Sequence, residues 1–178
     1  MKGVIFNLLE NLIVDKFGDK ILEEIYAAAH FSLDAPPFVG PETYPVAMVI
    51  LLSEKTNLPV DDLVYEFGKY MFPVLADRHP VFLDNVNSPI EFLKSVNDII
   101  HIEVKKLFEG ANPPIIKIED VNHRQVKLYY SSERKLCKLV EGLLDGVADY
   151  FGQKISYSHQ QCMRDGAREC ILHIQFYD

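Results

Sequence analysis

One histidine, His101, is predicted to lie on an apolar helix, where an imidazole needs a polar partner. Ile100 and Ile102 flank it, and Leu93 and Val104 lie on neighbouring faces of the same predicted helix. A buried imidazole must be hydrogen-bonded or bound to a metal. Two interpretations therefore stay open: a hydrogen bond to a carbonyl of another segment, which is the commoner case, and an axial metal ligand.

Two hydroxyls and a guanidinium recur at alternate positions where a predicted strand ends, at Tyr130, Ser132 and Arg134. On an extended backbone, alternate side chains point to one side, so the three donors are predicted to lie together. A guanidinium with hydroxyl donors suits one or two carboxylates, and the start of a following helix adds positive potential. The alternative is a strand-end tyrosine, a helix-capping serine and a surface arginine.

A second set of possible ligands lies toward the end of the sequence. Cys137 is placed in a predicted helix, and His159, Cys162 and Cys170 frame a predicted hairpin. Three thiols and one imidazole form a complete tetrahedral set for a structural zinc ion. The alternative is two small buried thiols and one exposed thiol. Oxidation with loss of zinc would allow a disulfide, so the set also predicts a redox sensor.

The elements that must position these residues change type along the chain. Apolar residues recur at helical spacing up to about Gly110, and they alternate after Pro113 and Pro114. The clearest helix begins at the capping box Ser88-Pro89-Ile90-Glu91 and is predicted to run unbroken to Phe108. Other helices are predicted over about 4–17, 20–30, 43–56, 60–76 and 133–151, and two hairpins over 116–130 and 153–176.

These elements predict an α+β fold in a single domain, 1–178. A helical N-terminal half, about 1–60, packs on a C-terminal half, about 61–178, with a four-stranded antiparallel sheet and helices. Three cysteines and the absence of a signal-peptide pattern favour a reducing compartment, so a cytoplasmic location is expected.

Composition excludes two classes of partner. The formal net charge is −8, and no basic cluster is longer than Lys105-Lys106, so nucleic acid is not an expected partner. The longest apolar run, 44–52, contains Pro45 and is far shorter than the roughly 20 residues of a membrane-spanning helix. No membrane segment is therefore expected.

The sequence resembles the haem nitric-oxide/oxygen-binding (H-NOX) family, the bacterial stand-alone relatives of the haem domain of soluble guanylate cyclase. The resemblance spans the chain and rests on Met1-Lys2-Gly3, on Ile100-His101 followed by Glu109-Gly110-Ala111-Asn112-Pro113-Pro114, and on the complete motif Tyr130, Ser132 and Arg134. It implies haem b buried between the two halves. His101 would be the axial ligand of the iron, the motif would hold the propionates, and Pro114 would press on the macrocycle.

The resemblance also bears on which gas is bound. Oxygen-binding members have a distal tyrosine five residues after the motif arginine, and here that position is Leu139. The resemblance implies a wholly apolar distal pocket, formed by Ile5, Leu9, Met71, Leu75, Leu139 and Leu143. It thus predicts a non-enzymatic sensor of nitric oxide that also binds CO and binds O₂ poorly or not at all.

Two further expectations follow from the resemblance. With no output domain in the sequence, the sensor is expected to regulate a separate protein, a histidine kinase or a cyclic-di-GMP enzyme. The spacing of His159, Cys162 and Cys170 resembles a zinc site found in a subset of the family. A zinc and thiol redox sensor, alone or in the same protein as the gas sensor, is the alternative function.

Overall fold

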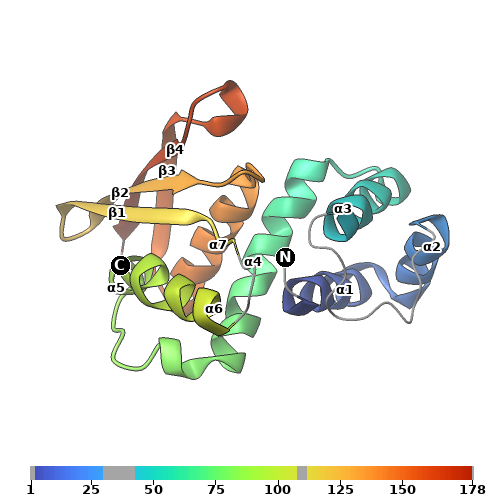
Figure 1. Ribbon diagram of the computed structural model, residues 1–178, viewed down its shortest axis with the longest axis horizontal. Helices are drawn as coiled ribbons and strands as arrows, with labels where there is room; N and C mark the ends of the chain where they lie inside the picture. Colours follow the sequence, from blue (N-terminus) through green and yellow to red (C-terminus); the bar gives the residue numbers. More distant parts are fainter. Residues whose placement is uncertain (1–2, 30–42, 108–111, 178) are drawn as a thin grey trace. The chain divides into compact units, whose positions relative to one another are not determined.

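The computed structural model describes residues 3–29, 43–107 and 112–177 of the chain. The chain divides into two compact units, Met1–Phe67 and Gly68–Asp178. The first unit is helical and the second combines helices with a sheet, so the predicted mixture of helices and antiparallel strands is confirmed (Figure 1).

The first unit is built from α1 (Gly3–Phe17), α2 (Asp19–Ala29), α3 (Thr43–Thr56) and the first part of α4 (Val60–Arg78). Gly18 separates α1 from α2 with φ +86°, a left-handed conformation that suits glycine and ends the first helix where the sequence predicts. The core of the unit consists of aliphatic, Met and Phe side chains at helical spacing: Leu8, Leu9, Leu12, Ile13, Ile25, Met48, Val49, Leu52, Leu63 and Phe67.

The second unit begins within α4 and contains one sheet together with several helical elements. Its helical elements are η1 (Pro80–Phe82), α5 (Pro89–Ser95), the π-helical turn η2 (Val96–Ile100), α6 (His101–Leu107), α7 (Cys137–Tyr150) and η3 (Met163–Asp165). Its strands are β1 (Ile115–Asn122), β2 (Gln125–Ser131), β3 (Lys154–Gln161) and β4 (Cys170–Tyr177). Both predicted hairpins are present, and the four strands form one antiparallel sheet in the order β1-β2-β4-β3.

The sheet buries one face, as the alternation of apolar residues predicts. Val126, Leu128 and Tyr130 of β2 are buried, and their register partners on β4 are Ile174, Leu172 and Cys170, which are buried too. This face shares a core with buried residues of α7, among them Val140, Leu144 and Val147. Sheet and helix thereby fix the strand ends where the motif and the cysteines lie.

Two predicted helices differ from the observed ones. The segment from Pro89 is not one unbroken α-helix, because the π-helical turn η2 interrupts it directly before His101; Phe108 lies outside the described residues. The helix predicted from Glu133 begins only at Cys137. Lys135 adopts φ +49°, outside the helical region, so the chain turns before the helix starts.

Helices α4 and α7 approach each other closely at Gly68. A Cβ atom there would lie 2.4 Å from the Leu139 carbonyl oxygen and 2.9 Å from the Leu143 nitrogen, both of them backbone atoms. At Gly146 of α7, a Cβ atom would lie 2.9 Å from the Phe72 Cβ. Glycine at these two positions therefore permits the close crossing.

Gly68→Ala is expected to lower the free energy of unfolding by about 1–3 kcal/mol, because the added methyl group forces the two helix backbones apart. The measurement is the midpoint of urea denaturation at unchanged m-value. Gly-to-Ala replacement at an open helical position stabilises by about 0.5–1 kcal/mol, so the sign of the change is the test. A stabilised variant would show that the helices do not meet at Gly68.

No helix in the described ranges is long and apolar enough to cross a bilayer.

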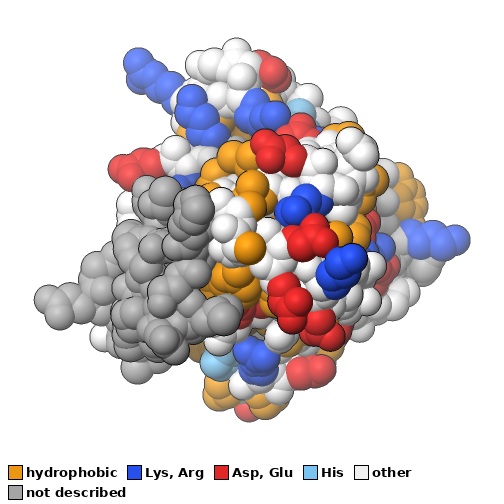
Figure 2. All heavy atoms as spheres, turned by 90° about the vertical axis from the view of Figure 1, so that its right-hand side faces the viewer, with side chains coloured by type: hydrophobic (Ala, Val, Ile, Leu, Met, Phe, Trp, Pro, Cys, Tyr) orange, Lys and Arg blue, Asp and Glu red, His pale blue; other side chains and the backbone are white. Residues whose placement is uncertain are grey.

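On the face that Figure 2 shows, acidic and basic side chains are interspersed with hydrophobic ones. Ion pairs within the first unit link its helices, Lys16 with Glu66 and Lys55 with Glu24.

Candidate functional site

His101 is the first residue of α6 and is half-buried. Its Nδ1 atom is shielded from solvent and has no hydrogen-bond partner within the described part of the chain. Burial lowers the pKa of His101 below its usual value, and the nearby backbone carbonyl of Pro114 raises it in part. The imidazole is therefore neutral at pH 7, which is the form that binds metals. A buried polar atom without a partner fits the requirement for an axial ligand.

The segment before β1 connects His101 with Arg134. The Pro114 carbonyl lies beside the His101 ring, and the Arg134 Nη1 donates a hydrogen bond to the Asn112 carbonyl at 3.2 Å. His101 and Arg134 are far apart in sequence, yet both contact the three residues 112–114. The structure thus brings the predicted axial ligand, the predicted propionate-binding arginine and Pro114 into one neighbourhood.

The motif residues are grouped by a turn rather than by an extended strand. β2 ends at Ser131, so the predicted alternation does not extend to Ser132 and Arg134 and does not place them on one side. Instead, the Arg134 backbone N–H donates a hydrogen bond to the Ser132 Oγ at 3.2 Å. The helix expected to start beside the motif begins later, at Cys137. Its N-terminus therefore does not directly adjoin Ser132.

Tyr130, the first motif residue, is buried at the end of β2. Its burial raises the pKa of the phenol, and the Ser132 hydroxyl and the Leu136 backbone lower it in part. The phenol therefore stays protonated at neutral pH and is available as a hydrogen-bond donor. Tyr130 and Ser132 are thus neighbours, with a hydroxyl on each.

The apolar residues expected around a bound gas lie on three helices. Met71 and Leu75 are on α4, and Leu139 and Leu143 are on α7, where the close crossing at Gly68 holds the two helices together. Met71 is buried, and the other three are half-buried. Ile5 and Leu9 are on α1 in the first unit, Ile5 half-buried and Leu9 buried.

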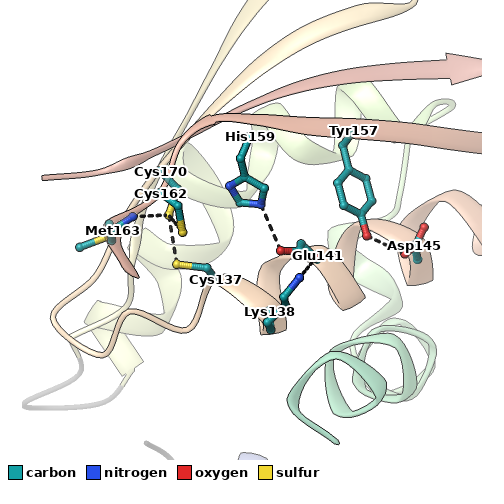
Figure 3. Close-up of polar contacts among 9 residues, drawn as sticks. All are labelled: Cys137, Lys138, Glu141, Asp145, Tyr157, His159, Cys162, Met163 and Cys170. Atoms are coloured by element: carbon teal, nitrogen blue, oxygen red, sulfur yellow. Dashed lines mark hydrogen bonds and ion pairs between the residues drawn. The ribbon is translucent and has the colours of Figure 1, made fainter. Parts of the chain in front are cut away.

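The three cysteines form a cluster between α7 and the tip of the β3–β4 hairpin (Figure 3). Their sulfur atoms all lie within 4.8 Å of one another. The Cys137 and Cys170 sulfurs are 3.1 Å apart, and Cys162 lies 3.7 Å from Cys170. Cys137 and Cys170 are buried and Cys162 is half-buried, so no thiol is exposed as the alternative interpretation required. Burial raises the thiol pKa of both Cys137 and Cys170.

His159, the predicted fourth ligand, lies beside this cluster but is engaged elsewhere. Its Nε2 is 3.1 Å from the Glu141 Oε1, and Lys138 donates to the other oxygen of the same carboxylate at 2.7 Å (Figure 3). The group that can hold a metal ion in the described residues therefore comprises the three cysteines alone. The ring nitrogen Nδ1 of His159 is not used in the bond to Glu141.

Glu141, the buried charged residue at this site, was not predicted from the sequence. It is 7% exposed, on the side of α7 that faces His159. Its spacing carried a usable signal, because Lys138 and Cys137 precede it by three and four residues on one helix face. A carboxylate bonded to one nitrogen of a histidine fixes the ring orientation and is common around zinc ligands.

A groove of about 540 Å³ lies near the start of α5 and the β1–β2 turn. Its lining includes Glu91, Lys94, Asp120 and Arg124, and it contains none of the predicted site residues. Lys94 and Asp120 already form an ion pair with each other at 2.7 Å. A charged, open groove of this kind does not suit an apolar macrocycle.

Comparison with known proteins gives one consistent result. A family model described as haem-NO-binding matches residues 2–159. The chain is similar to a crystal structure of an H-NOX protein from S. oneidensis in the Fe(II)NO state, with 35% identity, a TM-score of 0.92 and full coverage of both chains. It is also similar to an NMR structure of the Shewanella oneidensis H-NOX domain in the Fe(II)CO state (35% identity, TM-score 0.88, 100% and 99% coverage).

A more distant match is the crystal structure of the Fe(II) unliganded H-NOX protein from K. algicida, with 26% identity, a TM-score of 0.84 and 100% and 97% coverage. No curated protein matches the chain. The stretch covered by the family model includes His101, Pro114 and the Tyr130–Arg134 motif but ends before Cys162. Of the cysteine cluster, the matched stretch includes Cys137 but neither Cys162 nor Cys170.

Proposed function

The chain belongs to the haem-NO-binding (H-NOX) family, and on this premise we propose that it is a nitric oxide sensor whose haem is held by His101. The family binds haem and has the fold of a gas sensor. The observation that carries the proposal is the meeting of His101 and Arg134 at residues 112–114. His101 supplies a neutral imidazole, which can bind the metal of a porphyrin. Arg134 supplies a guanidinium, which can pair with the carboxylate side chains of the porphyrin.

The residues of the second unit fit a haem. His101 supplies the imidazole, and its shielded Nδ1 has no hydrogen-bond partner among the described residues. Tyr130, Ser132 and Arg134 would hold the propionates by hydrogen bonds and charge, and Pro114 would contact the ring beside His101. When bound, the iron supplies the site for a diatomic gas. The chain itself contributes orientation, exclusion of water and the choice among gases.

We propose that the choice among gases depends on the absence of hydrogen-bond donors from the side chains on the distal side. Leu139, Leu143, Met71 and Leu75 carry no hydrogen-bond donor in their side chains, and Ile5 and Leu9 are proposed to add to this pocket. NO and CO need no such donor, whereas dioxygen loses a stabilising hydrogen bond. We therefore expect strong NO binding, CO binding and little or no O₂ binding. The same residues offer no acid or base, so no catalytic activity is proposed.

Absorption spectra of the purified ferrous protein under argon, CO, NO and air test this proposal. The Soret band is expected to shift with NO and with CO and to keep its argon position immediately after exposure to air. A shift in air that is reversed by argon would show that O₂ binds and would contradict the proposed selectivity. Purified protein that takes up no haem would contradict the function as a whole.

Leu139→Tyr is expected to introduce O₂ binding, because the phenol adds a donor at a half-buried position of α7. One hydrogen bond corresponds to roughly tenfold in affinity. Leu139→Phe is the matched control, since it adds the ring without the hydroxyl. O₂ titration of the two ferrous proteins should separate them. Equal O₂ affinities would mean that position 139 does not face the gas.

We further propose that the sensor acts on a separate signalling protein, a histidine kinase or a cyclic-di-GMP enzyme. Family resemblance supports this output. Activity of a candidate kinase or cyclic-di-GMP enzyme is measured with the unliganded and the NO-treated sensor. A partner whose activity is the same in both cases would not be the target.

A zinc and thiol redox sensor is the second candidate function, in the same protein. Three sulfurs within 4.8 Å of one another support it. His159 lies beside them with its Nε2 bonded to Glu141, so its Nδ1 is the nitrogen proposed to complete the Cys₃His set. We propose a cytoplasmic location, where thiols stay reduced and available to zinc. Metal analysis of the purified protein tests for one zinc per chain.

A further inference from the structure

The helix that leads to His101 has apolar residues at the spacing of a straight α-helix, but its backbone is not a straight α-helix. In a straight α-helix a residue lies about 20° from the residue seven positions earlier and about 80° from the one eight positions earlier. Phe92 and Leu93 are buried on the inner face of α5. A straight helix would therefore place Ile99 and Ile100 on that face, and it would turn His101 about 80° away from Leu93.

The structure adopts a different register. The backbone N–H of His101 donates its hydrogen bond to the Val96 carbonyl, five residues earlier, which closes the π-helical turn η2. Such a turn accommodates one extra residue without turning the helix further. His101 thereby takes the direction of the seventh residue after Leu93 instead of the eighth.

Burial agrees with this register. His101 is half-buried and its Nδ1 is shielded from solvent, whereas Ile99 is 54% exposed. Ile100 is still packed against the core, at its margin. An isoleucine in this exposed position loses the apolar burial that the straight register would give it. The sequence thus prefers one register by its apolar pattern, and the fold uses the other.

We propose that Ile99 is one residue more than a straight α-helix would hold here, and that the π-helical turn that accommodates it positions the His101 imidazole for binding haem iron. The helix therefore has two possible registers, the straight one and the one with the π-helical turn. This inference rests on the proposed function only in taking His101 as the iron ligand. Ile99 is a positioning residue, since it acts through the helix and touches no ligand.

Deletion of Ile99 is the decisive experiment. Removing the extra residue lets α5 and α6 join as one α-helix, and His101 then becomes the seventh residue after Leu93, so it keeps the direction that the π-helical turn gives it. The ferrous spectrum should therefore match that of the unmodified protein and be insensitive to added imidazole. The backbone amides that remain around the deletion, those of residues 97, 98, 100 and 101, should exchange more slowly, because α-helical bonds replace the π-helical turn.

The matched control is insertion of one alanine after Ile99, which changes the length by the same amount in the opposite direction. This variant should lose the His101-ligated spectrum and should regain a similar spectrum when imidazole is added. Loss of ligation in the deletion variant, with ligation kept in the insertion variant, would overturn the proposal.

A third variant keeps the chain length and does not need haem. Ile99→Gln should shift the melting temperature of the haem-free protein by less than about 2 °C, because the side chain is exposed. A drop of more than about 6 °C would place Ile99 in the core and overturn the proposal even if the deletion variant does not fold. Failure of the proposed function would appear differently, as an unmodified protein that does not bind haem through His101.

Discussion

His101→Gly is expected to abolish tight retention of haem unless imidazole is added to the buffer. The side chain that is removed is a neutral, half-buried imidazole whose shielded nitrogen has no partner in the part of the chain that the structure describes. The substitution leaves a space that free imidazole fills. We therefore expect a low haem content after purification without imidazole and a His-like ferrous spectrum when imidazole is present.

The control for this variant must carry the same loss of helix stability that glycine causes. Glycine inside a helix costs about 1 kcal/mol relative to alanine, whatever the role of the side chain. Ile102→Gly places the same residue one position further along α6, where the native side chain is 44% exposed. Haem content should fall in His101→Gly and stay near the unmodified level in Ile102→Gly. Full haem loading of His101→Gly with an unchanged ferrous spectrum would rule out His101 as the ligand.

Much of this architecture could be predicted from local patterns. Alternation in β2 and β4 gave the strands and their buried face, because each of these strands has one face in the core and one outside it. Ser88 caps the helix as predicted, with the Ser88 Oγ accepting from the Glu91 N–H, and the Glu91 carboxylate accepts from the N–H of Asn87, one residue before the cap. Signals of this kind act within a few residues, so they can be found without the fold.

The errors arose where distant contacts decide the local structure. Apolar periodicity predicts an unbroken helix from Pro89, because that pattern places Ile99 inward, and the structure shows this prediction to be wrong. The observed π-helical turn turns His101 inward instead, which no local preference predicts. Similarly, the hydrogen bond from Arg134 to Asn112 joins residues 22 positions apart, so the turn that groups the motif was not apparent from alternation.

The cysteine cluster, too, was predictable from local signals only in part. Residue types and spacing predicted that the hairpin cysteines would meet, and α7 brings Cys137 to them across the fold. The role of Glu141 was not predicted, because a glutamate on a helix is usually exposed. It is buried here since Lys138 and His159 both bond to its carboxylate.

Cys170→Ser is expected to release zinc and to lower the melting temperature of the zinc-loaded protein. Cys170 is fully buried at the start of β4, and its sulfur is the central one of the cluster. The Met163 backbone N–H also donates to it, at 3.3 Å, so the sulfur joins η3 to the strand. A structural zinc contributes folding free energy directly, on the order of 10 kcal/mol in small zinc domains. Loss of one ligand should remove a large part of that contribution.

Chelation of the unmodified protein separates this effect from simple repacking. If zinc links the cysteines, a strong chelator should lower the melting temperature of the unmodified protein about as much as Cys170→Ser does, and it should barely affect the variant. If the three residues are only buried thiols, Cys170→Ser would still destabilise by placing a hydroxyl in an apolar site, but the chelator would change neither protein. The raised thiol pKa values of Cys137 and Cys170 would then keep both groups protonated and unreactive. Stoichiometric zinc in purified Cys170→Ser would exclude Cys170 from the ligand set.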